Sequence, residues 1–249
     1  MGPTETTIHR LLNSLKHIHM TLIDPEKADL KTAVETASSA ERAGSSAIMV
    51  GGSTLVSNRD LDEIVKGLKE VVRIPVILFP NNLVGISPYA DAIWFMSLLN
   101  SSNPYYFIEA QALGASLVKR YGLEAIPMAY LIVGEGCAAG FVGHARPISY
   151  RYPAIAAAYA LAGVSLGMRF VYLEAGSGAK EPVPPEMVSL VKQTTGVPII
   201  VGGGIRSGAA AREAAEAGAD IIVTGTILEE ASRVETRIEE IVAGLHARS

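Results

Sequence analysis

The sequence of 249 residues holds one cysteine, Cys137, and no uncharged apolar run long enough to cross a membrane. A single cysteine excludes a disulfide within the chain and is typical of a reducing compartment, so we expect a cytoplasmic protein. Hydrophobic residues amount to 49% and the mean hydropathy is +0.30. The most apolar segment, Pro153 to Met168, is still shorter than the roughly 18 residues of a transmembrane span. We therefore expect no transmembrane segment and interpret this segment as a buried or oligomer-facing helix.

Dense basic clusters are also absent from the sequence. The 21 Lys and Arg residues are outnumbered by 25 Asp and Glu residues, which gives a net charge of -4. No nucleic-acid partner is expected, because such proteins concentrate positive charge on one surface. The N-terminal segment lacks the basic-then-apolar order of a signal peptide. No shift in composition and no Pro/Gly/Ser linker divides the chain, so we expect a single domain over residues 1–249.

The sequence does contain a repeated alternation of short apolar runs and longer amphipathic segments. The predicted strands are Ile18–Ile23, Ala47–Val50, Val76–Phe79, Ala92–Met96, Ile126–Ile132, Phe170–Leu173, Ile199–Val201 and Ile221–Val223. The predicted helices are Asp29–Ala43, Asp60–Val72, Pro104–Tyr121, Tyr150–Gly167, Pro185–Thr194, Ser207–Ala217 and Glu229–Leu245, with a short one near Val84–Asp91. Eight strand-to-helix units in one domain predict an α/β fold, the (β/α)8 TIM barrel, and an open doubly wound sheet is the alternative.

The last two predicted strands end in glycines, at Gly202-Gly203-Gly204 and at Thr224-Gly225-Thr226. Glycines let backbone N–H groups approach an anion, and a helix that begins near Ser207 would direct its positive end to the same place. These loops are the usual phosphate site of the barrel fold. Tight turns are the alternative explanation, but the position of both loops favours phosphate binding.

Two other predicted strands end in carboxylates. Glu174 follows the sixth strand beside Ser177, where an acid-base group would meet a polar substrate, although a salt-bridged loop is the plain alternative. Asp24 follows the first strand and Ser53 the second. A carboxylate beside a phosphate site is typical of Mg²⁺, but Asp24 and Ser53 would equally serve as helix caps. The five histidines lack the Cys/His spacing of a zinc site, and we expect them on the surface or in the core.

The motifs LIDPEK, VGGS, LFPNN, YLEAGSGA, VGGGIRS and VTGT, in this order and at these separations, resemble the geranylgeranylglyceryl phosphate synthase family from Ile18 to about Ala243. The resemblance implies a TIM-barrel prenyltransferase that joins sn-glycerol 1-phosphate to geranylgeranyl diphosphate and releases diphosphate, in archaeal ether-lipid biosynthesis. It also implies Mg²⁺, a homo-oligomer and a transient membrane contact for the lipid product.

The resemblance assigns roles to individual residues. Asp24 and Ser53 match magnesium positions, and Glu174 would orient or deprotonate the acceptor hydroxyl. Some relatives carry a lysine where Leu22 stands here. The glycerol phosphate would be bound by Tyr172, Leu173, Glu174, Ala175, Gly176, Ser177, Gly178, Gly203, Gly204, Gly225 and Thr226.

The prenyl chain needs a long apolar groove. We expect its wall near Val84–Asp91, with aromatic residues such as Trp94, Tyr105 and Tyr106. Three alternatives stay open from the sequence: a longer donor, as in heptaprenylglyceryl phosphate synthase; a phosphate-binding barrel isomerase or lyase of tryptophan or histidine biosynthesis; and a non-catalytic barrel that binds a phosphorylated metabolite.

Overall fold

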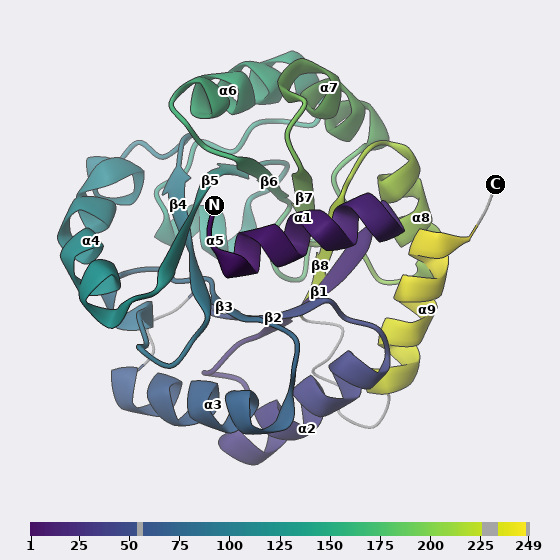
Figure 1. The fold of residues 1–249 in the computed structure, drawn as a ribbon. Helices are drawn as coiled ribbons and strands as arrows, with labels where there is room; N and C mark the ends of the chain where they lie inside the picture. The colour runs from purple at the N-terminus through teal and green to yellow at the C-terminus, as the bar shows by residue number, and fades with distance from the viewer. Residues whose placement is uncertain (54–56, 226–233, 248–249) are drawn as a thin grey trace.

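The computed structural model describes residues 1–53, 57–225 and 234–247. Eight parallel strands form a closed barrel in sequence order, and β8 pairs with β1 through Ile18↔Ile221 to Thr21↔Thr224 (Figure 1). The closure confirms the predicted TIM barrel and excludes the open sheet. The strands are β1 (Ile18–Ile23), β2 (Ala47–Val50), β3 (Val76–Leu78), β4 (Ala92–Leu98), β5 (Glu124–Ile132), β6 (Phe170–Glu174), β7 (Ile199–Gly202) and β8 (Ile221–Thr224).

Helices surround the barrel, and two short irregular turns accompany them (Figure 1). Gly44 and Gly218 adopt positive φ angles of 96° and 110° directly after α2 and α8, as the sequence predicts for helix ends. The helices are α1 (Pro3–Leu15), α2 (Leu30–Arg42), α3 (Asn58–Val71), α4 (Ala110–Tyr121), α5 (Cys137–Val142), α6 (Pro153–Ser165), α7 (Pro185–Thr195), α8 (Gly208–Glu216) and α9 (Val234–His246), with the 3₁₀ turn η1 (Leu83–Gly85) and the π-helical turn η2 (Tyr105–Glu109).

The apolar residues of the strands divide between two layers, because successive side chains point to opposite faces of a sheet. Met20, Trp94 and Phe170 pack inside the barrel. Ile48 and Val50 face outward and pack with residues of α2 and α3. The strands are thus buried on both faces, which explains why the sequence shows them as continuous apolar runs.

The helix α1, which the sequence analysis did not predict, closes the amino end of the barrel (Figure 1). Ile8 is 1% exposed and belongs to the interior cluster. The carboxylate of Glu124 accepts the backbone N–H groups of Thr4 and Glu5 at 2.6 and 3.1 Å, and so caps the first turn. The prediction failed because two of the three buried positions of this helix are the polar residues Thr4 and Glu5.

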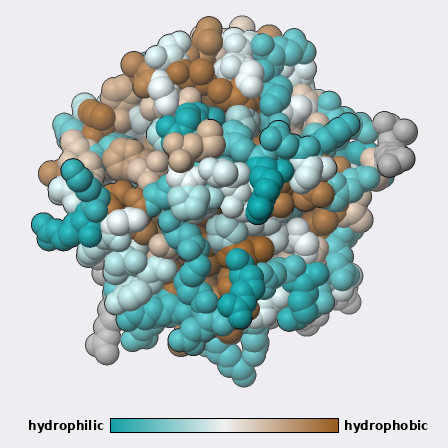
Figure 2. Space-filling view, viewed as in Figure 1, coloured by the Kyte–Doolittle hydropathy of each residue, from teal (hydrophilic) through white to brown (hydrophobic). Residues whose placement is uncertain are grey.

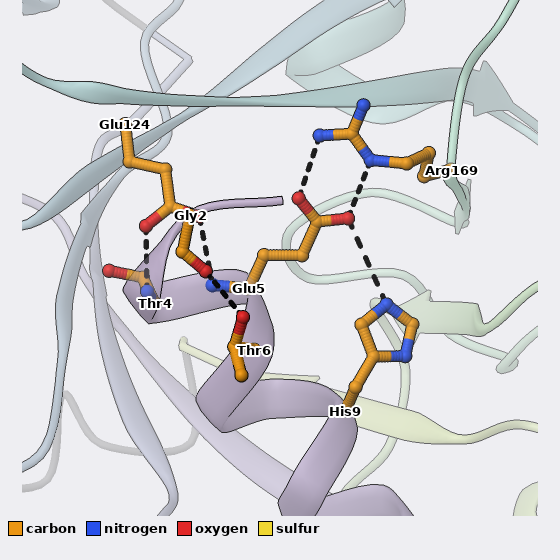
Figure 3. Close-up of polar contacts among 7 residues, drawn as sticks. All are labelled: Gly2, Thr4, Glu5, Thr6, His9, Glu124 and Arg169. Atoms are coloured by element: carbon orange, nitrogen blue, oxygen red, sulfur yellow. Dashed lines mark hydrogen bonds and ion pairs between the residues drawn. The ribbon is translucent and has the colours of Figure 1, made fainter.

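An ion pair fixes α1 to the start of β6. The guanidinium of Arg169 donates two hydrogen bonds to the carboxylate of Glu5, at 2.6 and 2.7 Å, and Nε2 of His9 lies 3.8 Å from the same carboxylate (Figure 3). The Glu5 side chain is completely buried. The amino end of the barrel is therefore closed by a paired, hydrogen-bonded carboxylate.

Three predicted helices differ from the structure. The helix expected near Val84–Asp91 is wrong: only η1 forms, with the Asn82 side chain accepting the N–H of Val84, and Pro88 prevents continuation. The segment Pro104–Tyr121 divides into η2 and α4, and the helix predicted from Tyr150 begins at Pro153. The short helix α5 was not predicted, and residues 229–233 of the last predicted helix lie outside the described residues.

Candidate active site

A cavity of about 860 Å³ opens where the strands end. Its wall includes Asp24 after β1, Ser53 after β2 and Glu174 at the end of β6, together with the loops after β7 and β8. These residues are far apart in the sequence, and the barrel closure brings them to one rim. This is the face on which barrel enzymes carry their active sites.

Three aromatic rings lie side by side at the base of this region. The ring of Phe79 stacks on Tyr172 with centroids 5.4 Å apart, and Tyr130 meets each of them edge-on at 5.5 and 5.3 Å. Tyr130 and Tyr172 are register partners in β5 and β6, so both hydroxyls point into the barrel interior. Burial raises the pKa of both phenols well above 10, and both are neutral hydrogen-bond donors at neutral pH.

Glu174 lies among these groups as a buried carboxylate, 6% exposed. Its Oε1 accepts the N–H of Gly176 at 2.6 Å, and its Oε2 lies 3.5 Å from the hydroxyl of Tyr130. Burial raises the pKa of Glu174, and the hydrogen bonds from Gly176, Tyr172 and Tyr130 oppose that rise. Among the described residues, no Lys, Arg or His forms an ion pair with it. A carboxylate with a raised pKa in a cavity is suited to accept a proton.

The glycine loop after β7 touches the loop after β6. Gly203 has φ +85°, and a Cβ there would lie 2.6 Å from the carbonyl oxygen of Gly176 and 2.9 Å from Oε1 of Glu174. Gly204 has φ +75° and would place a Cβ 2.6 Å from Pro182 N. Glycine is required at both positions, by the backbone conformation and by the close approach.

The helix α8 begins beside these glycines. Ser207 caps it by accepting the N–H of Ala210 at 3.2 Å, and Arg206 lines the cavity while donating to the carbonyl oxygen of Ala179 at 3.0 Å. The N–H of Gly208 in its first turn is already bound by the carboxylate of Glu240 at 3.2 Å, so the helix contributes its positive end next to the glycine loop. The arrangement is that of an anion site made mainly of backbone.

Across the cavity, Asp24 lies against the loop after β2. A Cβ on Gly52 would lie 2.4 Å from Oδ1 of Asp24, so only glycine admits the carboxylate at this place, next to Ser53. Oδ1 also accepts the N–H of Glu26 at 3.1 Å. The described residues contain no group of three or more His, Cys, Asp or Glu side chains that could hold a metal ion by themselves.

Of the site residues predicted from the sequence, most line the cavity, three do not, and one lies outside the described residues. Leu173 and Ala175 are buried in the outer core cluster, and Gly176 contributes its N–H to Glu174. Thr226 lies outside the described residues. The predicted residues that line the cavity are Asp24, Ser53, Tyr172, Glu174, Ser177, Gly178, Gly203, Gly204 and Gly225.

Sequence reasoning missed Tyr130 and Arg206 as site residues. Tyr130 lies within a strand, where an aromatic residue is ordinarily core, and only its register opposite Tyr172 reveals that the two hydroxyls share the site. That register follows from closing the barrel, which the alternation of residues alone does not specify. Leu22, at the position where some relatives carry lysine, packs with its Cβ about 3.4 Å from the place of a Cβ on Gly225.

The cavity continues away from the polar rim between η1 and α4. Side chains on one face of α4 and residues of β4 form this apolar extension. Tyr106 also lines the cavity, and its ring centroid is 5.1 Å from that of Tyr105. Its lining residues are Leu83, Ile86, Ile93, Phe95, Gly114 and Val118.

Comparison with known proteins agrees with this site. The model of the PcrB family matches residues 12–245. The geranylgeranylglyceryl phosphate synthase of Thermococcus kodakarensis is 56% identical over 248 residues, covering 98% of each chain, and that of Methanothermobacter thermautotrophicus is 54% identical over 241 residues, covering 97% of this chain and 98% of the relative.

A solved structure is similar over nearly the whole fold. It is (S)-3-O-geranylgeranylglyceryl phosphate synthase from Thermoplasma acidophilum in complex with its substrate sn-glycerol-1-phosphate, 42% identical, with a TM-score of 0.92 over 96% of this chain and 97% of that chain. Family match, identity and fold agree over the entire barrel. The chain therefore belongs to the PcrB family, together with these geranylgeranylglyceryl phosphate synthases.

Proposed function

We propose that the protein is a geranylgeranylglyceryl phosphate synthase: it joins the hydroxyl of sn-glycerol 1-phosphate to the allylic C1 of geranylgeranyl diphosphate and releases diphosphate. The observation that carries this proposal is the buried carboxylate of Glu174, which forms no ion pair with a Lys, Arg or His in the part of the chain that the structure describes. This carboxylate shares one cavity with an anion site of glycine loops, a rim carboxylate, Asp24, and a long apolar extension.

The phosphate of the acceptor binds at the loops after β6, β7 and β8. Gly203 and Gly204 offer N–H groups without side chains, and the first turn of α8 adds its positive end. Arg206 supplies a guanidinium at the cavity wall, whereas Leu22 supplies no charge at the position where some relatives carry lysine. With its phosphate fixed there, the acceptor presents its hydroxyl to the neighbouring carboxylate, which is the entropic advantage of a bound nucleophile.

Glu174 acts on that hydroxyl. The carboxylate takes the proton as the oxygen attacks, while Tyr130 and Tyr172 hold the carboxylate in place with neutral hydroxyls. Gly176 fixes the other carboxylate oxygen at 2.6 Å. The rate advantage comes from pairing a positioned base with a positioned acceptor.

The magnesium site we propose consists of Asp24 and Ser53. Mg²⁺ typically binds one or two carboxylates and takes its other ligands from substrate phosphates and water, and the rim offers one carboxylate and one hydroxyl. Bound there, the ion would neutralise the departing diphosphate. Asp24 would hold it, and Gly52 leaves the room for the carboxylate to lie beside Ser53.

The prenyl chain lies in the apolar extension between η1 and α4. Ile86, Ile93 and Val118 line it and are at most 5% exposed. The geranylgeranyl chain is the donor we propose, and a longer chain, as in heptaprenylglyceryl phosphate synthase, is the alternative, because the depth of the extension sets the chain length.

We also propose a homo-oligomer located in the cytoplasm. No helix among the described residues is long and apolar enough to cross a membrane. Large apolar side chains are instead exposed on α5 and α6, and Figure 2 shows apolar surface over α6 at the upper edge of the view. Phe141 is 87% exposed and Leu166 71%. Exposed apolar side chains of this kind are typical of subunit contacts. Those that remain uncovered would allow a transient membrane contact for release of the lipid product.

The test is incubation with sn-glycerol 1-phosphate and prenyl diphosphates of graded length, with Mg²⁺ and with chelator, followed by assay of diphosphate and of the ether product. We expect the product with the C20 donor and loss of turnover with chelator. No product with any donor would sink the proposal and favour a phosphate-binding isomerase, a lyase or a metabolite-binding barrel. Product only with a C35 donor would favour the heptaprenyl alternative.

A further inference from the structure

A chain of four buried polar side chains lies directly behind the phosphate loop of β8. His19 Nε2 is 2.8 Å from the hydroxyl of Thr224, and His19 Nδ1 is 2.7 Å from the hydroxyl of Ser45. The hydroxyl of Thr21 lies 2.7 Å from the same Ser45 oxygen. All four residues are at most 4% exposed. Buried polar groups of this kind must satisfy one another, so their geometry is fixed.

The chain joins three elements and reaches the functional rim at Thr224. His19 and Thr21 belong to β1, Ser45 precedes β2, and Thr224 ends β8. Thr21 and Thr224 are register partners, and β1 continues from Thr21 to Asp24. Thr224 lines the cavity and is followed at once by Gly225. The same hydrogen bonds therefore join the strand that carries Asp24 to the loop that carries Gly225.

His19 is a neutral imidazole in this environment. Complete burial lowers its pKa to about 3, so at neutral pH the ring has one donor and one acceptor nitrogen. With the proton on Nε2 the ring donates to Thr224, and with the proton on Nδ1 it accepts from Thr224. One hydrogen bond joins His19 to Thr224 in either tautomer.

We infer that His19 is a positioning residue for acceptor binding: through its Nε2 it holds Thr224, and thereby the phosphate-binding loop at Gly225, in register with the strand that carries Asp24. The inference rests on the proposed function. His19 does not line the cavity, so it acts through Thr224 and touches no substrate.

The chain itself offers matched variants. Glutamine places a polar atom where His Nε2 stands, and asparagine places one where Nδ1 stands. His19→Gln therefore keeps the bond to Thr224, while His19→Asn keeps only the bond to Ser45. His17 is a control, because its Nδ1 bonds the carbonyl oxygen of Ala219 at 2.8 Å at the other end of the barrel, away from the cavity.

The experiment measures kcat, the KM for sn-glycerol 1-phosphate, calorimetric binding of that ligand alone, and thermal unfolding for each variant. We expect His19→Asn and Thr224→Val to raise the KM and the Kd about threefold to tenfold, the effect of one neutral hydrogen bond, with kcat within about twofold of wild type. His19→Gln and His17→Gln keep the wild-type KM. Thermal unfolding curves show whether a variant with a raised KM and an unchanged kcat is also generally destabilised.

The outcomes distinguish the inference from the function on which it rests. A wild-type protein that neither binds glycerol 1-phosphate nor turns over overturns the proposed function and the inference with it. An active wild type whose KM is unchanged in both His19→Asn and Thr224→Val overturns the inference alone. Equal KM changes in His19→Gln and His19→Asn also overturn it, because the bond to Thr224 would then be irrelevant.

Discussion

Two buried glutamates occupy opposite ends of the barrel and differ in their partners. Glu5, at the amino end, is completely buried and receives two short hydrogen bonds from Arg169. Glu174, at the carboxyl end, is buried beside neutral hydroxyls and a backbone N–H, and its pKa is raised. A buried carboxylate is costly unless a cation compensates it. Glu5 is compensated by Arg169 and stabilises the amino end of the barrel. Glu174 retains the tendency to take a proton, which its proposed chemistry requires.

The largest expected effect is on catalysis. Glu174→Gln should lower kcat by about 10²- to 10⁴-fold, the usual contribution of a positioned base. Its unfolding temperature should not fall, because the change removes a buried charge that has no cationic partner among the described residues. Glu5→Gln is the matched control, in which activity at a permissive temperature stays and stability falls. Steady-state kinetics and thermal unfolding of both variants check the contrast, and a stable, fully active Glu174→Gln would break it.

Removal of the cation at the amino end should affect stability alone. Arg169→Met leaves Glu5 buried without its partner, and we expect a loss of about 2–3 kcal/mol in the free energy of unfolding. The value lies below that of a fully buried pair because Arg169 is 40% exposed. Denaturant unfolding measures it. The double variant Arg169→Met/Glu5→Gln should regain part of the lost stability. If its loss equals the sum of the losses of the two single variants, the two residues do not act as a pair.

The third prediction compares alanine substitutions at two glycines, one in the crowded loop of the candidate site and one on the surface. Gly203→Ala should raise the KM for glycerol 1-phosphate about tenfold or more, because its Cβ would displace the Gly176 backbone and Oε1 of Glu174. Gly122 is the control: its φ of +69° is similarly strained for alanine, but a Cβ there meets nothing within 4 Å. Both variants should lose about 1–2 kcal/mol from backbone strain. Only a KM change confined to Gly203→Ala supports the assignment.

The smallest expected effect concerns pH. A base must be ionised, so kcat/KM should fall as the pH drops through the Glu174 pKa, which burial places above 4.5. The hydrogen bond from Tyr130 favours the ionised form, and Tyr130→Phe should raise that pKa further. The acid limb of the kcat/KM profile should therefore move to higher pH in the variant. A limb that moves to lower pH would contradict the assigned electrostatics.

The sequence predicts those parts of the fold that show a clear pattern of apolar residues. All eight strands were predicted within one or two residues of their observed ends, because each is buried on both faces. The helix α1 was not, since polar residues stabilise it through contacts with Glu124 and Arg169, which are distant in the sequence.

The candidate site, too, contains residues that the sequence predicts and residues that it does not. Residues at strand ends, such as Asp24 and Glu174, follow from the fold rule and lie in one cavity. Tyr130 and His19 lie within strands, and their contacts depend on the register between neighbours. No local pattern distinguishes such residues from ordinary core, so only the closed barrel reveals them.

One measurement tests the central claim most directly: the single-turnover rate of Glu174→Gln with saturating sn-glycerol 1-phosphate and geranylgeranyl diphosphate, beside calorimetric affinity for the acceptor. We predict a rate at least about 100-fold below wild type, with acceptor affinity within about threefold, because the carboxylate acts on the hydroxyl and the glycine loops bind the phosphate. A wild-type single-turnover rate in this variant would contradict the account.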